Sequence, residues 1–200
     1  MTQPAIAGLI LSAGASSRMG TPKALLGFQG ETFLDRLLRL FAAVCSSLTV
    51  VLGYEPRRIL EGVRRVDAAN VIINPDPARG MLSSLQCGLA GLREMDAVMF
   101  TPVDYPAIAA STVQELAAAW ERTRAPLAVP VYRGERGHPV CIGSSVVAQL
   151  LELPPSAQAR DVIRAHYAGA CFVEVDDPGI VADVDRPEDY RALLTAAEAL

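Results

Sequence analysis

Arg18 and Lys23 are the residues of this sequence whose types and spacing best suit the binding of a polyphosphate. They stand five positions apart in "LSAGASSRMGTPK", residues 11–23, directly after the apolar run "AIAGLI". An arginine offers a planar fork of N–H donors and a lysine offers a compact charge. Gly14 and Gly20 can take positive φ, which lets backbone N–H groups approach an anion closely. The segment therefore predicts a phosphate-binding turn between a strand and a helix.

Three serines of the same segment, Ser12, Ser16 and Ser17, add hydroxyl donors to the turn. The segment matches neither the G-x-G-x-x-G dinucleotide pattern nor the P-loop pattern G-x-x-x-x-G-K-[ST]. On residue types alone it is equally consistent with a surface loop that carries two solvated cations. Its place after the first apolar run favours phosphate binding, because ligands of open α/β sheets lie at the carboxyl ends of the strands.

Asp104 is the strongest candidate for a metal ligand. It ends the apolar stretch "AVMFTPVD", and Tyr105 and Pro106 follow it. Mg²⁺ accepts one or two carboxylates and fills its other positions with phosphate oxygens and water, so a carboxylate at the end of a strand suits this ion. The alternative is an aspartate that only shapes a turn.

Apolar runs that alternate with helical patterns must position these residues. The alternation predicts a doubly wound, parallel sheet, and the continuous hydrophobicity of the runs indicates strands covered by helices on both faces. Loops rich in proline and glycine follow several of the runs, and we expect these loops at the same edge of the sheet as residues 11–23. The runs are residues 5–11, 48–53, 70–74, 96–101, 127–132 and 170–175.

Helical periodicity separates these predicted strands. Thr32 and Ser111 are candidate N-caps, and Pro187 stands near the first turn of the last predicted helix. Gly88 and Gly91 are interpreted as sites of close packing on a helix. The predicted helices are residues 31–44, 56–66, 81–92, 111–123, 144–153 and 186–200.

Composition excludes several classes of partner. A length of 200 residues favours one domain, and a net charge of −4 provides no basic field for nucleic acid. No apolar stretch approaches the roughly 20 residues that span a bilayer, and no basic region opens a signal peptide. We therefore expect a cytoplasmic protein without membrane partners, a monomer or a small homo-oligomer. Four cysteines lack metal-ligand spacing, and we expect them to be reduced core residues: Cys45, Cys87, Cys141 and Cys171.

The sequence resembles the MobA-like nucleotidyltransferases, whose signature L-x-[AG]-G-x-S-x-R-M-G-x-x-K is matched at every position by residues 11–23. The resemblance continues in the family's order through "NPDPARGMLSSLQCGL", "VDYP", "RGERGHPVCI" and "VADVDRPEDY". It implies an α/β fold of the nucleotide-diphospho-sugar transferase type. This is a three-layer α/β/α Rossmann-like fold with a mostly parallel central sheet, as a single domain over residues 1–200.

The resemblance also implies roles for individual residues. Arg18, Lys23 and Asp104 would be catalytic, His138 would border the pocket of the accepting substrate, and Asp104 and Asp183 would hold Mg²⁺. Without the resemblance, a lone histidine is equally consistent with a structural role. The nucleotide would be bound by Leu11, Ser12, Ala13, Gly14, Ser16, Arg18, Lys23, Asn74, Gly80, Ser83 and Ser84.

Two departures and one alternative concern the acidic segments. Tyr105 stands where the family has methionine or glutamine, and Arg186 stands where threonine is usual. Asp185 is interpreted as the N-cap of the last helix, with Glu188 three residues on, or as a residue behind the metal ligands.

The reaction implied is Mg²⁺-dependent transfer of a nucleoside monophosphate to a phosphorylated small-molecule acceptor, with release of pyrophosphate. Ala13 before Gly14 resembles the cytidylyltransferase branch that matures molybdenum cofactor, which favours CTP. The alternatives are a guanylyltransferase, a sugar-phosphate or alditol-phosphate nucleotidyltransferase, and a regulatory protein that binds nucleotide without turnover. A Rossmann dehydrogenase is disfavoured, because the dinucleotide pattern is missing.

Overall fold

The computed structural model describes residues 5–92 and 95–198. Its main strands are β1 (Ile6–Ser12), β4 (Ser47–Leu52), β5 (Asn70–Ile73), β6 (Ala97–Pro102), β7 (Leu127–Tyr132), β8 (Glu135–Arg136), β9 (Val140–Gly143) and β10 (Cys171–Glu174). They form one eight-stranded sheet in the order β10-β7-β9-β6-β1-β4-β5, with β8 paired to β7. Strand β1 runs parallel to β4 and β6, whereas β9 runs antiparallel to β6 and β7. A separate hairpin consists of β2 (Gly27–Phe28) and β3 (Glu31–Thr32).

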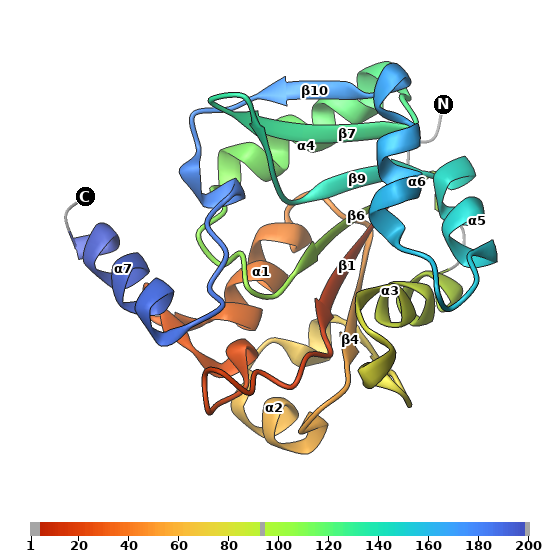
Figure 1. The fold of residues 1–200 in the computed structure, drawn as a ribbon. Helices are drawn as coiled ribbons and strands as arrows, with labels where there is room; N and C mark the ends of the chain where they lie inside the picture. Colours follow the sequence, from red (N-terminus) through yellow and green to blue (C-terminus); the bar gives the residue numbers. More distant parts are fainter. Residues whose placement is uncertain (1–4, 93–94, 199–200) are drawn as a thin grey trace.

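Helices cover both faces of the sheet (Figure 1). One face packs against α1 (Phe33–Ala42) and α4 (Ala110–Thr123), and the other against α3 (Met81–Ala90), α5 (Ser144–Glu152) and α6 (Ala159–Ala165). Consecutive residues of β1 serve opposite cores, because side chains alternate along a strand: Ile10 packs in the first core and Leu9 in the second. The predicted three-layer α/β/α fold with a mostly parallel sheet is confirmed.

Two further helices and five short 3₁₀ turns complete the described residues. Helix α2 (Pro56–Gly62) follows β4, and α7 (Pro187–Glu198) ends the described chain at its C-terminal side (Figure 1). The 3₁₀ turns are η1 (Lys23–Leu25), η2 (Val66–Ala68), η3 (Pro77–Arg79), η4 (Tyr167–Gly169) and η5 (Pro178–Ile180). No helix within residues 5–92 and 95–198 combines the length and the hydropathy needed to cross a membrane.

The capping predictions had mixed outcomes. The Thr32 hydroxyl accepts a hydrogen bond from the Asp35 N–H, as predicted for an N-cap. Ser111 was wrong as a cap, because α4 starts one residue earlier, at Ala110. The carboxylate of Asp177, 65 residues from Thr112, instead accepts hydrogen bonds from the Ala109 N–H and the Thr112 hydroxyl. A remote side chain thus replaces the local cap.

The largest shift of a predicted helix end occurs in residues 56–66, and one helix was not predicted. The predicted helix 56–66 ends at Gly62, and the Asp35 carboxylate then accepts hydrogen bonds from the N–H groups of Arg64 and Arg65, which holds the chain out of the helix. Helix α6 was not predicted, because it is only seven residues long and lies after a proline-rich loop.

Gly88 and Gly91 are confirmed as close-packing residues of α3. A Cβ atom on Gly88 would lie 2.5 Å from Leu9 Cδ1 and 2.9 Å from Val51 Cγ2, and one on Gly91 would lie 2.4 Å from Ile72 Cδ1. The helix can therefore lie directly on β1, β4 and β5. The four cysteines are free thiols, of which Cys141 is fully buried and the others are partly buried.

Candidate active site

A cavity of about 370 Å³ opens at the carboxyl ends of β1 and β6. This is the edge at which ligands of open α/β sheets bind. Its wall consists of the loop after β1, the start of α3, the loop after β6, and Asp185 from the segment before α7. The predicted site residues that line it are Leu11, Ser12, Ala13, Gly14, Ser16, Arg18, Lys23, Gly80, Ser84 and Asp104.

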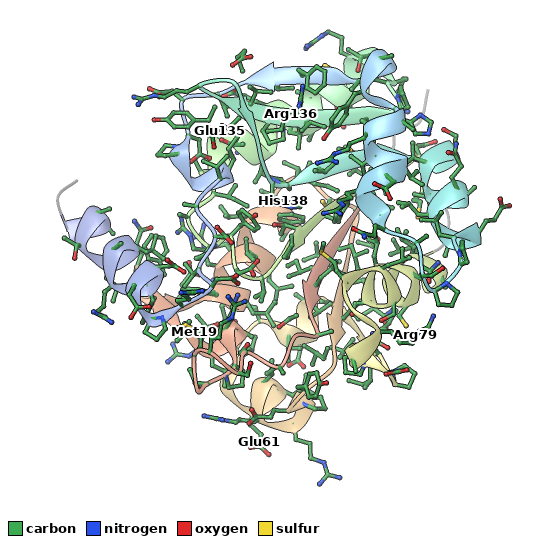
Figure 2. The ribbon with its side chains drawn as sticks, in the orientation of Figure 1. Met19, Glu61, Arg79, Glu135, Arg136 and His138 are labelled. Carbon is green, nitrogen blue, oxygen red and sulfur yellow. The ribbon has the colours of Figure 1, made fainter. Side chains whose placement is uncertain are left out.

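The loop after β1, which includes the labelled Met19 in Figure 2, turns through Ser16 and Gly20. Their φ angles are 49° and 69°, in the left-handed region. The Ser16 hydroxyl accepts a hydrogen bond from the Lys23 N–H at 3.1 Å, which closes the turn. The predicted positive φ at Gly14 is wrong, but a Cβ atom there would meet nothing within 4 Å. Gly14 thus leaves free space at the cavity wall, and Ser16 provides the backbone turn.

Gly53 lies behind the cavity wall and was not predicted from sequence. It follows β4, and a Cβ atom on it would lie 2.5 Å from the carbonyl oxygen of Ala13 and 2.7 Å from Pro77 Cβ. The glycine therefore allows two walls of the cavity to approach each other. A lone glycine directly after an apolar strand was the available signal.

Two cations and two carboxylates meet in the cavity. The Lys23 ammonium lies 2.9 Å from Asp104 Oδ2 and 2.5 Å from Asp185 Oδ1, and Arg18 Nη2 lies 3.0 Å from Asp185 Oδ2. The four formal charges cancel, so the cluster is balanced without a ligand. The side chain of Lys23 is 12% exposed and that of Arg18 is 57% exposed. Lys23 is thus held inside the cavity wall, whereas Arg18 lies at its mouth.

The surroundings of these groups shift their proton affinities. Burial lowers the pKa of Lys23, but the charges and hydrogen bonds of Asp104 and Asp185 together outweigh burial and raise it above its usual value. The hydrogen bond from Lys23 is the largest effect on Asp185 and holds the pKa of that carboxyl below its usual range. At neutral pH the cluster therefore contains charged lysine and charged carboxylate.

Asp104 has the features of a ligand for a divalent metal ion. Its Oδ1 atom is buried and has no hydrogen-bond partner among residues 5–92 and 95–198, while Oδ2 contacts Lys23. A buried carboxylate oxygen without a partner is costly unless a ligand binds it. The described part of the chain offers no group of three or more metal-ligating side chains. One or two carboxylates are enough for Mg²⁺, which completes its coordination shell with phosphate oxygens and water.

The second carboxylate beside Asp104 is that of Asp185, while the predicted ligand Asp183 is exposed and does not line the cavity. Asp185 also does not cap α7. The carboxylate of Asp189 does so, accepting hydrogen bonds from the N–H groups of Asp185 and Arg186 at 3.0 and 2.7 Å. Asp189 is the third residue of the helix, a position from which a carboxylate can cap, and this signal was overlooked. With the cap supplied by Asp189, the side chain of Asp185 can face Lys23.

Asn74 and Ser83 support the cavity from behind. The Asn74 side-chain amide donates hydrogen bonds to the hydroxyls of Ser83 and Ser84, at 2.9 and 3.0 Å, and all three residues are buried. Of the three, only Ser84 lines the cavity. Gly80, with φ of 90°, precedes α3 and brings its first turn to the cavity wall. Asn74 therefore orients Ser84 toward the space where a nucleotide would lie.

Comparison with known proteins decides the class of this site. The sequence profile of the MobA-like NTP transferase domain matches residues 8–170. The chain belongs to the MobA-like NTP transferase family. Nucleotidyl transfer is therefore its class of reaction.

Relatives of this MobA-like transferase match it over nearly their whole length. It is 28% identical to the molybdenum cofactor cytidylyltransferase of Escherichia coli K12, covering 97% of this chain and 96% of that protein. It is 26% identical to nicotine blue oxidoreductase of Paenarthrobacter nicotinovorans, with 96% and 97% covered.

The fold is shared with crystal structures of Rv0371c from Mycobacterium tuberculosis H37Rv. One of them has a TM-score of 0.86 and 26% identity over 98% of this chain and 100% of that chain. A manganese complex of Rv0371c has a TM-score of 0.80 at 23% identity, over 96% and 99% of the two chains.

A second cavity of about 380 Å³ adjoins the first in this MobA-like transferase. Met81 lines both cavities, and Tyr105, the residue after Asp104, lines the second. His138, which was predicted to border an acceptor pocket and is labelled in Figure 2, lies in the wall of this second cavity. Its ring centroid is 4.6 Å from that of Tyr105. The two cavities therefore meet beside Asp104.

His138 and Tyr105 are both uncharged at neutral pH. Burial lowers the pKa of His138 to about 4, and Nδ1 is buried without a partner in the described part of the chain. Burial raises the pKa of Tyr105 to about 12, with further contributions from the charges of Asp183, Asp104 and Asp185. These two rings thus offer an aromatic, uncharged wall where the cavities meet.

Proposed function

We propose that this protein transfers CMP from CTP to the phosphate of a small acceptor, with Mg²⁺ as cofactor and pyrophosphate as the second product. The acceptor that we favour is a form of the molybdenum cofactor, because a full-length relative is named molybdenum cofactor cytidylyltransferase. The nucleotide would occupy the cavity beside β1, and the acceptor the cavity beside His138.

The observation that carries this proposal is the cluster of Arg18, Lys23, Asp104 and Asp185 in one cavity. Transfer between phosphates needs little covalent chemistry from a protein, because the rate comes from in-line positioning and from neutralisation of charge. Two cations for a triphosphate and two carboxylates for a metal ion meet these needs. The junction of the two cavities beside Asp104 would bring donor and acceptor together.

In the proposed reaction, an oxygen of the acceptor phosphate attacks the α-phosphorus of CTP, and the bond from this phosphorus to the bridging oxygen of the β-phosphate breaks. Lys23 and Arg18 exchange their carboxylate contacts for oxygens of the triphosphate and stabilise the leaving pyrophosphate. Asp104 and Asp185 would hold Mg²⁺, which when bound neutralises charge on the phosphates. No general base is needed, because a phosphate monoester is already ionised near neutral pH.

Manganese in a solved structure of the same fold supports the expectation of a divalent ion. In this chain the support is the buried, unpartnered oxygen of Asp104 with Asp185 beside it. The choice of Mg²⁺ rests on its preference for carboxylate and phosphate oxygens.

The preference for CTP rests on Ala13, which lines the nucleotide cavity beside Gly14. Its methyl group restricts the approach of a purine to the backbone, and steric discrimination of this kind is worth about 1–3 kcal/mol. The test is protection from thermal unfolding by CTP or GTP, each with Mg²⁺, because a ligand that binds the folded state raises the melting temperature. We expect greater protection by CTP. Equal or greater protection by GTP would contradict the cytidylyl assignment.

The second candidate function is that of an oxidoreductase, because one full-length relative is named nicotine blue oxidoreductase. Reduction would require a bound electron carrier, and four charged groups around a cavity fit a triphosphate and a metal ion better. An assay of pyrophosphate release distinguishes these candidates. A nucleotidyltransferase releases pyrophosphate, whereas an oxidoreductase or a regulatory protein that binds nucleotide without turnover does not.

A further inference from the structure

Two aromatic rings position the guanidinium group of Arg136 at the second cavity. Arg136, on β8, lies with its guanidinium carbon 4.6 Å from the ring centroid of Tyr167 and 5.1 Å from that of Phe172. The two ring planes are inclined by 68° with their centroids 5.7 Å apart, so the guanidinium does not lie between parallel faces but contacts two rings that meet edge to face. Tyr167 belongs to η4 and Phe172 to β10, so three separate elements build this arrangement.

The hydrogen-bonding capacity of Arg136 is not used for an ion pair. Arg39, Arg58 and Arg191 each pair with a glutamate, whereas no ion pair of Arg136 occurs among residues 5–92 and 95–198. Its neighbour Glu135 also lines the cavity but does not pair with it. A guanidinium has five N–H donors in a fixed fork that matches the two oxygens of a carboxylate or a phosphate. The rings restrict the side chain in advance, which lowers the entropic cost of binding such a group.

The position of Arg136 places it away from the site of transfer. The two cavities meet beside Asp104, at the end of β6, whereas Arg136 rests on Phe172 of β10. In the sheet order, β10 lies three positions from β6, roughly 14 Å at the usual spacing of about 4.8 Å between strands. The cavity wall also contains the apolar side chains of Phe100, Val129 and Ile163. Figure 2 shows Arg136 and His138 on the segment between β7 and β9.

We propose that Arg136 determines acceptor specificity by binding an oxyanion, a carboxylate or a phosphate, at the end of the acceptor remote from the phosphate that receives the nucleotide. The inference rests on the proposed function for the place of the second cavity in the reaction. The acceptor class is then a molecule with a second anionic group remote from the phosphate that receives the nucleotide, and such a molecule would replace the molybdenum cofactor as the acceptor in the proposed function. Arg160 and Glu135 line the same cavity, and their opposite charges leave Arg136 as the net positive charge among the three.

Calorimetric titration with three synthetic probes tests this assignment. They are biphenyl-4-yl phosphate, its 4′-carboxy derivative and biphenyl 4,4′-bisphosphate. We expect at least one doubly anionic probe to bind the wild type roughly tenfold more tightly than the first, as charge-assisted hydrogen bonds would give. The tighter of the two identifies carboxylate or phosphate as the preferred oxyanion. Arg136→Met should abolish this preference while retaining affinity for biphenyl-4-yl phosphate, and Arg136→Lys should retain part of it, because lysine keeps the charge without the fork.

Arg133→Met is the matched control. Arg133 also stacks on an aromatic ring, with its guanidinium carbon 5.0 Å from the Tyr132 ring centroid, but it does not line the cavity. This variant should keep the wild-type preference. Equal affinity of the wild type for all three probes, no binding of any probe, or an unchanged preference in Arg136→Met would overturn the assignment. Protection by CTP and Mg²⁺ reports on the first cavity in the same variants, so its absence in the wild type would count against the proposed function instead.

Discussion

Lys23 is the residue on which the chemistry of the first cavity depends most. Without nucleotide it lies between Asp104 and Asp185, and these carboxylates raise its pKa, so it remains a cation. In the proposed reaction the same ammonium binds the triphosphate, and the carboxylates become available to a metal ion. The ion pairs therefore keep the cavity ordered and charge-balanced until its ligands arrive.

The first prediction at the scale of single residues separates Asp185 from Asp183. Asp185→Asn should lower kcat on the order of 10²-fold, because it removes a carboxylate beside Asp104. Asp183→Asn is the matched control, since Asp183 is exposed outside the cavity, and its rate should stay within about twofold of the wild type. Initial rates across a Mg²⁺ titration provide the comparison. A large loss in Asp183→Asn with a normal rate in Asp185→Asn would restore the assignment made from sequence.

The second prediction concerns His138 and pH. The pKa of His138 is about 4 in the folded state and 6.5 in the solvent-exposed, unfolded chain, because burial disfavours the charged ring. The unfolded chain therefore binds the proton first as the pH falls. Stability from this group is complete above pH 6.5 and is lost toward pH 4. The loss between pH 7 and pH 5 should be about 2 kcal/mol. Denaturant unfolding of the wild type and His138→Gln at both pH values measures it; equal losses in the two proteins would show that the ring is not buried as described.

The parts of the site that one continuous segment forms could be predicted from the sequence. The parts that depend on contacts between side chains of different segments could not. The loop at residues 11–23 was recognised from its own pattern, and it lines the cavity. The choice between Asp183 and Asp185 depended on which side chain caps α7, and Asp189 supplies that cap. Likewise, no local pattern reveals that Asn74 lies behind Ser84 rather than in the cavity.

At the scale of elements, glycines set how closely α3 and the loop after β1 approach their neighbours. Gly88→Ala should destabilise the protein by about 1–3 kcal/mol, because the new methyl group would collide with Leu9 and Val51 in the core.

Gly14→Ala should affect ligand binding rather than stability. Its methyl group would enter open space at the cavity wall, so the melting temperature should hold while affinity for CTP falls roughly tenfold or more.

Thermal unfolding of both glycine variants, with and without CTP and Mg²⁺, checks this prediction. A stable Gly88→Ala variant would mean that α3 does not pack on the sheet as described. A Gly14→Ala variant that CTP protects as well as the wild type would place the nucleotide elsewhere.

The elements themselves were largely predictable. The six predicted strands are all present, because continuous apolar runs between helical patterns have few alternatives in a doubly wound sheet. The elements outside the predicted runs and helices are short: β2, β3 and β8 have two residues each, β9 has four, and α6 has seven. Such elements are stabilised by tertiary contacts, such as the packing of Arg136 on Tyr167 and Phe172, rather than by their own periodicity.

At the scale of the whole molecule, two cavities lie along the sheet and meet beside Asp104. The antiparallel strand β9 separates β7 from β6, and the chain that leads into it carries both Arg136 and His138. The first half of the chain thus supplies most of the nucleotide cavity, and the second half most of the wall of the other. This division suits an enzyme that joins two different phosphorylated molecules.

Transfer of label from CTP tests the central claim most directly. CTP labelled at the α-phosphorus is incubated with the protein, Mg²⁺ and molybdenum cofactor, with the sugar phosphates and alditol phosphates as further acceptors. The account predicts that label appears in a product joined to the acceptor phosphate, with one pyrophosphate released per label, and that Lys23→Ala lowers the rate on the order of 10²-fold or more. Release of labelled CMP without any joined product, or an equal rate in Lys23→Ala, would contradict it.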